Sequence, residues 1–200
     1  MSSTNRGKAR NTADYYVTPV EAVLDFIAAL RADLPKWTPR LVLDPCAGGD
    51  PKHEMSYPLA LGKVWSDVEI ATVDIREDSL AQYCGDYLAC DIAQDILDKA
   101  GRPFAPDLVM SNPPFCLAME FLQKALLDVA KEGYVVMLLR LNYFGTQKRR
   151  DWWKGHMPLL TYVHSERMGF TDDGKTDSIE YMHCVWQKDN FPAKTRLSVI

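Results

Sequence analysis

The sequence has no apolar stretch long enough to cross a membrane and no cysteine pair spaced for a metal site. A membrane-spanning helix needs about 20 consecutive apolar residues, and no run in the chain approaches that length. The five cysteines are scattered and never form Cys-x-x-Cys, and the four histidines show no ligand spacing with them. We therefore expect a cytoplasmic protein with reduced thiols and no metal site.

Two common phosphate-binding fingerprints are also missing. The turn DPCAGGD at residues 44–50 is not Gly-x-Gly-x-x-Gly, and no Gly-Lys-Ser/Thr follows it. Dinucleotides and nucleoside triphosphates are therefore disfavoured as ligands. The net charge of -4 argues against a protein that coats nucleic acid by bulk attraction, so any contact with nucleic acid is expected to be local.

The N-terminal residues lack the apolar core of a secretory signal. Residues 1–13 are polar and are expected to form a flexible tail. Residues 14–200 fit one domain of ordinary size, and a hydrophobic fraction of 47% can build a sizeable core.

Apolar segments of helical and strand-like pattern alternate along that domain. In the helix expected at residues 18–34, Thr18 is the N-cap, Pro19 the first helical residue, and Glu21 completes a capping box. Further helices are expected at residues 76–85 and 117–133, and strands at residues 40–44, 69–75, 86–92, 107–112, 134–144, 160–170 and 178–188. The pattern predicts an α/β fold: a doubly wound, mostly parallel, seven-stranded sheet whose last strand, near Glu180 to Gln187, is antiparallel.

Four polar residues fall at the ends of successive predicted strands. They are Asp44, Asp74, Asp91 and Asn112. The carboxyl ends of parallel strands share one edge of a doubly wound sheet, and ligands bind in the crevice there. An Asp at the end of the second strand suits a ribose diol, which NAD-type ligands and S-adenosylmethionine both carry.

The stretch SNPPF, residues 111–115, decides between these ligands. In this order, LDPCAGG, VDI, CDI and SNPPF resemble motifs I to IV of class I S-adenosylmethionine-dependent methyltransferases, with the Asn-Pro-Pro-aromatic version of the enzymes that methylate amino groups. YYVTPVEAVLDFI, ahead of motif I, resembles motif X of gamma-class DNA adenine-N6 methyltransferases. Residues 138–153 and 167–186 are similar to stretches of small phage and prophage enzymes. The chain leaves little room for the separate target-recognition domain of larger gamma enzymes.

The resemblance implies a Rossmann-like fold and a catalytic motif formed by Asn112, Pro113, Pro114 and Phe115. An exocyclic amine is a poor nucleophile because its lone pair is delocalised into the ring. Two acceptors, the side-chain oxygen of Asn112 and the carbonyl of Pro113, would hold the amine so that its lone pair points at the methyl group. Phe115 would stack on a base flipped out of the duplex.

The resemblance also implies which residues bind the cofactor. Asp74 would accept hydrogen bonds from the ribose, Ile75 would pack on the adenine ring, and Asp91 would accept from the adenine amine. Asp91 is preferred over Asp86 because the predicted strand runs into it. Residues near the methionine portion would be Thr18, Pro19, Asp44, Pro45, Cys46, Ala47 and Gly48. Thr18 and Pro19 are equally explained as a plain helix cap.

One cluster of basic residues offers a contact to DNA. QKRRDWWK holds Lys148, Arg149 and Arg150 beside two tryptophans, and it reads either as a solvated face or as a phosphate-binding edge with stacking rings.

The sequence therefore predicts methylation of adenine N6 in DNA. The alternatives are an amino-methyltransferase that acts on cytosine N4, an RNA base or a protein glutamine, and a fold relative that binds S-adenosylmethionine without chemistry.

Overall fold

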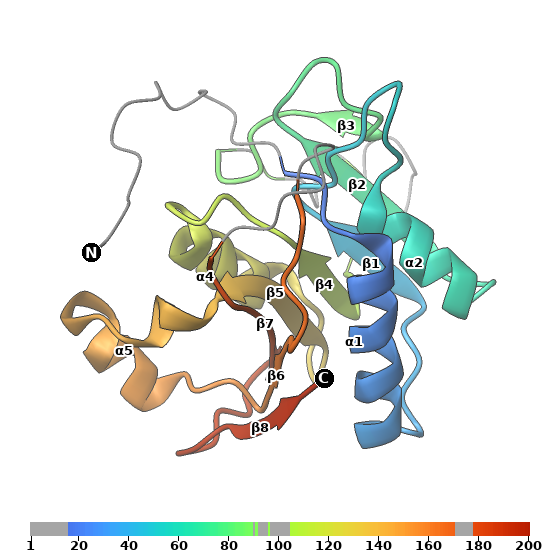
Figure 1. Cartoon of the computed structure of the whole chain (residues 1–200). Helices are drawn as coiled ribbons and strands as arrows, with labels where there is room; N and C mark the ends of the chain where they lie inside the picture. The colour runs from blue at the N-terminus through green and yellow to red at the C-terminus, as the bar shows by residue number, and fades with distance from the viewer. Residues whose placement is uncertain (1–15, 90, 92–95, 97–104, 171–177) are drawn as a thin grey trace.

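Eight strands form one sheet in the computed structural model, which describes residues 16–89, 91, 96, 105–170 and 178–200. Their order across the sheet is β3-β2-β1-β4-β5-β7-β6-β8 (Figure 1). Seven strands run parallel, and β7 is antiparallel to both of its neighbours. The strands are β1 (Leu41–Asp44), β2 (Glu69–Asp74), β3 (Tyr83–Cys84), β4 (Leu108–Ser111), β5 (Tyr134–Arg140), β6 (Leu160–Val163), β7 (Tyr181–Gln187) and β8 (Arg196–Val199).

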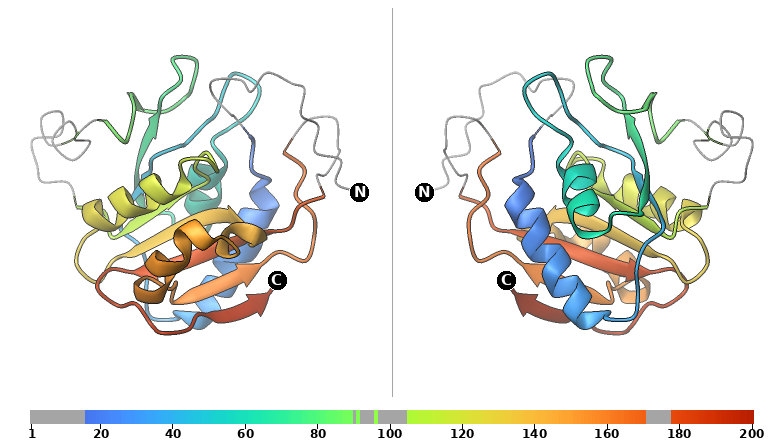
Figure 2. Two further views of the ribbon diagram at one scale, coloured as in Figure 1. Left: turned by 90° about the vertical axis from the view of Figure 1, so that its left-hand side faces the viewer. Right: turned by 90° about the vertical axis from the view of Figure 1, so that its right-hand side faces the viewer.

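Helices cover both faces of this sheet. The two views of Figure 2 show α1 (Val20–Asp33) and α2 (Ser56–Val64) on one face, and α4 (Ala118–Asp128) and α5 (Arg150–Gly155) on the other. Two short 3-10 helices, η1 (Leu141–Phe144) and η2 (Gln147–Arg149), join β5 to α5. No helix within these described ranges is both long and apolar enough to cross a bilayer.

Alternation along the central strands gives each face its own core. In β5, Val135 and Met137 join the cluster packed against α4 and α5, whereas Tyr134 and Val136 join the cluster under α1 and α2. Successive side chains of a strand point to opposite faces, so a strand covered on both faces must be apolar throughout. This explains why YVVMLL and LVM are unbroken apolar runs.

The antiparallel position of the strand near Glu180 to Gln187 is confirmed. β7 lies between β5 and β6, and Tyr134 pairs with Gln187 at one end of the ladder. The sheet has eight strands rather than seven, because residues 196–199 add β8 to the edge of β6. Neither β8 nor α2 was predicted. The expected tail at residues 1–13 lies outside the described residues.

The first helix begins one residue later than its capping pattern predicted. Pro19 is the residue before α1, with φ -57° and ψ 126°, and no side chain caps the helix. The capping box of Thr18 and Glu21 is therefore wrong. The Thr18 hydroxyl instead accepts a hydrogen bond from Nδ2 of Asn112 at 3.1 Å.

The predictions between β2 and β4 were also wrong. Residues 76–82 form turns and bends rather than a helix, and β3 covers Tyr83–Cys84 rather than residues 86–92. Side chains compete with helical hydrogen bonds here, because the Ser79 hydroxyl donates to the Gly48 carbonyl and accepts from the Ala81 N–H. The remaining residues of the expected strand include Cys90 and Ile92, which lie outside the described residues.

Candidate functional site

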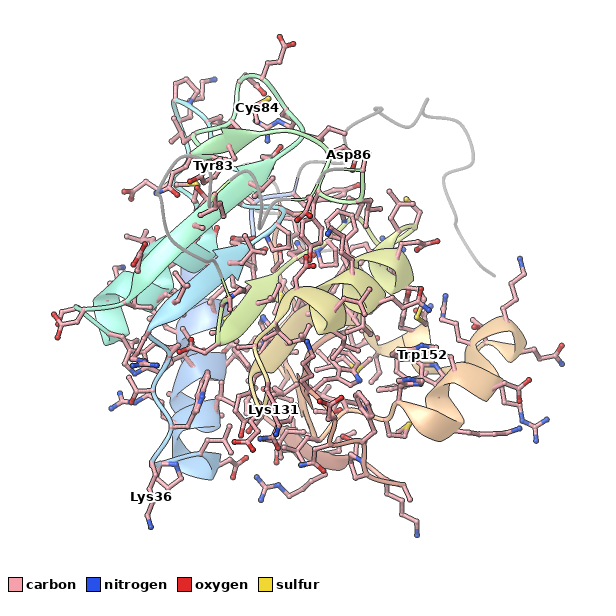
Figure 3. All side chains as sticks on the ribbon, turned by 180° about the vertical axis from the view of Figure 1, so that it is seen from behind. Lys36, Tyr83, Cys84, Asp86, Lys131 and Trp152 are labelled. Carbon is pink, nitrogen blue, oxygen red and sulfur yellow. The ribbon has the colours of Figure 1, made fainter. Side chains whose placement is uncertain are left out.

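The carboxyl ends of β1, β2 and β4 meet at one edge of the sheet. β1 pairs in parallel with β2 on one side and with β4 on the other, so the turns after all three strands are neighbours. Figure 3 shows Asp86 at this end of the molecule, with Lys36 and Lys131 toward the opposite end. Asp44, Asp74 and Asn112 each end or follow one of these strands, as the sequence predicted.

A cavity of about 270 Å³ opens at this edge. Ligand pockets typically have volumes of roughly 300–1,000 Å³, so the cavity lies close to the lower end of that range. Eleven of the predicted site residues line it: Thr18, Pro45, Cys46, Ala47, Gly48, Asp74, Ile75, Asn112, Pro113, Pro114 and Phe115. Pro19, Asp44, Asp91, Lys148, Arg149 and Arg150 are not among its lining residues.

The turn after β1 forms the floor of the cavity and depends on two glycines. Gly48 and Gly49 have φ of 64° and 76°, a region that side chains other than glycine rarely adopt. A Cβ on Gly49 would also lie 2.7 Å from Cγ of Met55. The N–H of Gly48 donates to Oδ2 of Asp74 at 2.8 Å, which joins this turn to the end of β2.

Asp74 and Ile75 present the two kinds of surface that a nucleoside needs. Asp74 is buried and its carboxylate accepts backbone N–H groups from Gly48 and Arg76, at 2.8 and 2.9 Å. Each carboxylate oxygen can accept more than one hydrogen bond, so capacity for a hydroxyl remains. Ile75 is 62% exposed although it is apolar, and it lines the same cavity.

Asp86 lines the cavity near Ile75, whereas Asp91 does not. Gly85, the residue before Asp86, donates its N–H to the Asp74 carbonyl. Oδ1 of Asp86 accepts the Leu88 N–H at 3.0 Å. The geometry therefore favours Asp86 over Asp91 for a ligand in this cavity. The preference for Asp91 depended on a strand at residues 86–92, whereas residues 87–89 form a turn.

Asp44 lies beneath the cavity and is fully buried. Its Oδ1 accepts hydrogen bonds from the Ser111 hydroxyl at 2.6 Å and from the Cys46 N–H at 3.2 Å, while its Oδ2 has no partner. Burial raises the pKa of Asp44 to about 7, and these two hydrogen bonds oppose that rise. A positive charge bound above the turn would stabilise the ionised form.

Cys46 lies in the same turn and is not an activated nucleophile. Burial raises the pKa of its thiol well above 9.0, and the neighbouring Asp44 and Asp74 act in the same direction. A thiol becomes reactive where its pKa is lowered, so Cys46 serves as a small packing residue.

Asn112 brings a free hydrogen-bond acceptor to the cavity. Its Nδ2 donates to Oγ1 of Thr18 at 3.1 Å, and its Oδ1 is buried without a partner among the described residues. A buried amide oxygen without a partner costs about 1–3 kcal/mol, which a ligand N–H would recover. The segment ahead of α1 and the NPPF motif are thus in direct contact.

Phe115 sits at the border of the cavity with its ring already in contact with protein. The Arg140 guanidinium lies 4.5 Å from the centre of the ring, and the Tyr181 ring lies 5.6 Å away. Phe115 is half-buried and packs with Met168 and Phe170. Phe115 therefore supports local packing and also lines the cavity.

The three basic residues behave differently from one another. Lys148 and Arg150 are exposed. Arg149 is half-buried, and its guanidinium lies 3.7 Å from the centre of the Tyr143 ring while Nε donates to the Tyr143 carbonyl. Lys148 and Arg150 are therefore available to bind phosphate, whereas Arg149 stabilises the segment that carries them.

Sequence reasoning missed several residues that line the cavity, among them Tyr16, Glu54 and Tyr57. Tyr16 belongs to the stretch that resembles motif X. Tyr57 comes from α2, which the sequence did not predict because Pro58 and Gly62 interrupt its helical pattern. A proline in the first turn of a helix removes no intrahelical hydrogen bond, so the helix forms nevertheless.

No protein-family model and no curated protein sequence matches the chain, but solved structures share its fold. A Listeria monocytogenes protein assigned to the class I S-adenosylmethionine-dependent methyltransferases superposes with a TM-score of 0.66 at 14% identity, over 98% of this chain and 68% of that one. A Pyrococcus horikoshii protein assigned as an RNA methyltransferase gives 0.57 at 15% identity, over 92% and 94%. The M protein of the type I restriction enzyme EcoKI gives 0.50 at 12% identity, over 76% and 40%.

The strand order and these similarities define the architecture as the class I methyltransferase fold. Within this fold, the chain carries its cavity where the strand order reverses, beside β1 and β4, which is where open α/β sheets bind ligands.

Proposed function

We propose that the protein transfers a methyl group from S-adenosylmethionine to the exocyclic N6 amine of adenine in DNA. The observation that carries this proposal is the partnerless, buried Oδ1 of Asn112 at the cavity. An acceptor in this position suits an amine substrate and gives no advantage to a hydroxyl or carbon nucleophile that needs a base.

Two rigid acceptors account for the activation of the amine. Oδ1 of Asn112 and the carbonyl oxygen of Pro113 each accept one amine N–H, which leaves the nitrogen lone pair directed at the methyl group. Pro113 and Pro114 limit the backbone freedom of this loop, so little ordering is left to the reaction step. With S-adenosylmethionine bound, its methyl group would pass to the amine nitrogen held by these two acceptors, with the sulfur as the leaving group, and the amine would then lose a proton to solvent.

The residues of the cavity fit S-adenosylmethionine. The cofactor supplies a methyl group on a positively charged sulfur. Asp74 suits the ribose hydroxyls, exposed Ile75 suits a face of the adenine ring, and Asp86 suits the adenine amine. The partnerless Oδ2 of Asp44 beneath the turn favours a cationic ligand above it.

Three observations support adenine in DNA as the substrate. The segment that resembles motif X contacts Asn112 through Thr18, so the order of motifs typical of gamma-class enzymes is matched by a contact in the structure. Lys148 and Arg150 are exposed on the segment after β5, the strand next to β4. The EcoKI M protein, a DNA adenine methyltransferase, shares the fold.

Transfer of tritiated methyl groups to DNA, RNA and protein, followed by nucleoside analysis, tests the proposal. We expect label in N6-methyladenine of DNA, and none with the Asn112→Ala protein purified in parallel. Label in N4-methylcytosine, in RNA or in protein would contradict adenine in DNA as the substrate, and the proposed activation of an amine would still hold. A protein that binds S-adenosylmethionine and labels none of the three would be a fold relative without this chemistry.

A further inference from the structure

One arginine lies against the ring of Phe115 at the border of the cavity. Cζ of Arg140 is 4.5 Å from the centre of that ring. Arg140 is the last residue of β5, the strand between β4 and β7 (Figure 1). β4 ends at Ser111, which pairs with Met137, so β5 extends three residues beyond the point where β4 gives way to the NPPF motif. The parallel pairing therefore brings a cation to the edge of the sheet that carries the NPPF motif.

β7 holds the backbone of Arg140 from the other side. Arg140 pairs with Tyr181 in the ladder of β5 and β7, and the Leu141 N–H donates to the Glu180 carbonyl at 2.9 Å. The Tyr181 ring also lies 5.6 Å from the Phe115 ring. A guanidinium over an aromatic ring is attracted by the electrons of the ring and uses none of its hydrogen-bond donors in that contact. The side chain is thus positioned while its donors stay available.

The charge of Arg140 has no counter-charge in the part of the chain that the structure describes. Among those residues no carboxylate forms an ion pair with Arg140, and its Nε is buried without a hydrogen-bond partner. Glu180, the residue before Tyr181, instead lies 4.0 Å from Nη2 of Arg167. A guanidinium is always charged in proteins, and a half-buried charge without an acceptor costs free energy. An anionic ligand on Arg140 would recover that cost.

The position of Arg140 determines which anion fits. Phe115 lines the cavity and Arg140 does not, so an anion on Arg140 lies outside the cavity, next to its Phe115 border. In a nucleotide that is flipped out of a duplex, the base enters the pocket while its backbone stays at the entrance. The planar fork of a guanidinium matches two oxygens of a phosphate in a pair of parallel hydrogen bonds. The phosphate of the flipped nucleotide is therefore the anion that this geometry favours.

We propose that Arg140 binds a phosphate that flanks the target nucleotide and thereby selects a nucleic acid over a protein side chain as the methyl acceptor. The inference rests on the proposed function, because it takes Phe115 as the face on which the target base stacks. A glutamine side chain offers the same kind of nitrogen, but it has no anion at a fixed distance from it. RNA carries the same phosphate as DNA, and the labelling of DNA and RNA described above separates the two. Arg140 acts in substrate capture and does not touch the reacting atoms.

Replacement of one phosphate by a methylphosphonate tests the contact, because it removes the charge and keeps the length of the backbone. The methylated adenine is first located in a DNA that the wild type labels, and each of its two flanking phosphates is then replaced in turn. With the wild-type protein, kcat/KM should fall by about tenfold or more at one of the two positions, the scale of one hydrogen bond to a charged group. Arg140→Met keeps an apolar stem against Phe115 without the charge. It should show that loss with unmodified DNA and no further loss with the methylphosphonate, because both changes remove one interaction.

Two further variants serve as controls. Arg140→Lys keeps the charge without the fork and should retain part of the response to the methylphosphonate, which also covers the case that Arg140→Met does not fold. Arg31→Met removes an exposed charge from the last turn of α1 and should behave as the wild type does. Equal losses with the methylphosphonate in the wild type and in Arg140→Met would overturn the proposal, and so would no loss in the wild type at either position. Weaker binding of S-adenosylmethionine by Arg140→Met would place the residue at the cofactor and would also overturn it.

DNA binding supplies a measurement that needs no methyl transfer. With S-adenosylhomocysteine present, loss of one phosphate contact in Arg140→Met should reduce the slope of log affinity against log salt by about 0.9 relative to the wild type. A wild-type protein that methylates no DNA, together with this change in slope, would refute the proposed function and leave the phosphate contact of Arg140 intact. An unchanged slope in a protein that does methylate adenine would overturn the role of Arg140 and leave the proposed function intact.

Discussion

The Gly48 N–H donates to the Asp74 carboxylate at 2.8 Å, so the turn after β1 and the end of β2 are held as one unit. Arg76 supplies a second N–H to the other oxygen at 2.9 Å. Two backbone segments, the turn after β1 and the end of β2, therefore meet at a single buried carboxylate that lines the cavity. A change at Asp74 is expected to affect a bound ligand and the shape of the turn together.

Asp74→Ala should weaken binding of S-adenosylmethionine by about 1–3 kcal/mol, because charge-assisted hydrogen bonds to the ribose are lost. The affinity for DNA should remain nearly unchanged. Titration calorimetry measures the first quantity, and Asp67→Ala, which removes an exposed acid before β2, is the matched control. Equal cofactor affinity in the Asp74→Ala and wild-type proteins would remove Asp74 from the site.

Asn112→Ala should slow methyl transfer by about 10²-fold or more, which is the scale of losing one preorganised polar contact in a transition state. Cofactor affinity should stay close to that of the wild type, since Asn112 faces the amine rather than the nucleoside. Single-turnover rates are compared with Asn142→Ala, which removes an exposed amide on η1. An Asn112→Ala enzyme with the wild-type rate would show that NPPF is a structural turn only.

Phe115→Ala and Phe115→Leu should both weaken capture of the flipped base. Stacking on an aromatic side chain contributes about 1–3 kcal/mol per base, and leucine restores apolar packing against Tyr181 without a ring face. The measured quantity is kcat/KM for DNA, with Phe115→Tyr as the variant expected to retain it. If leucine restores full activity, the ring serves packing and does not contact the base.

Lys148→Ala combined with Arg150→Ala should flatten the salt dependence of DNA binding. Each phosphate contact contributes about -0.9 to the slope of log affinity against log salt, so two lost contacts should reduce the slope by about 1.8. Arg149 is kept because its contacts with Tyr143 stabilise the segment. Lys36→Ala with Lys131→Ala removes the same charge at the opposite end of the sheet (Figure 3) and should leave the slope unchanged. If the two double variants had the same slope of log affinity against log salt, a phosphate contact at Lys148 and Arg150 would be excluded.

Asp44→Asn should change how stability depends on pH. The folded pKa of about 7 lies above the ordinary value of 3.8, so between these values the folded state binds more protons than the unfolded state. Protonation of Asp44 therefore stabilises the folded wild-type protein at low pH. This contribution to the free energy of unfolding is lost as pH rises from about 4 to 7, with a slope of at most about 1.4 kcal/mol per pH unit, and no further change is expected above pH 7. The asparagine side chain does not titrate. The free energy of unfolding of the Asp44→Asn protein, relative to that of the wild type, should therefore rise between about pH 4 and 7. Urea unfolding of both proteins from pH 4.5 to 8 measures the difference, and a difference that does not vary with pH would exclude an elevated pKa at Asp44.

The parallel core of the fold could be predicted because its strands are apolar on both faces and each ends in a polar residue. This reasoning placed β1, β2, β4 and β5, and it brought Asp44, Asp74 and Asn112 to one edge. It failed after β2, where ten residues of apparent helical spacing were too few to outweigh the hydrogen bonds of Ser79. The expected strand at residues 86–92 had favoured Asp91 as the adenine ligand, whereas Asp86 is the one of the two that lines the cavity.

The buried contacts of His183 with Tyr57 and with His164 had no sequence signal at all. Tyr57, His164 and His183 are separated by more than a hundred residues at the extremes, and each looks like an ordinary core position. Only the register of β6 on β7 brings the two histidines together, and only the packing of α2 against the sheet brings the tyrosine to them. Thr18 was read as a helix cap because a local pattern was available and its distant partner was not visible.

The insertion of β7 between β5 and β6 also sets an order of events during synthesis. Until residues 181–187 leave the ribosome, β5 has no neighbour on that side, and the unpaired N–H and C=O groups of this apolar strand are open to other chains. β7 then completes the sheet and delivers His183 in the same step. A nascent chain that has made everything through β6 therefore already holds the cavity residues but lacks the strand that separates β5 from β6. A chain that ends before β7, because its message is truncated or because a protease has cut it, should aggregate rather than form a weakened enzyme.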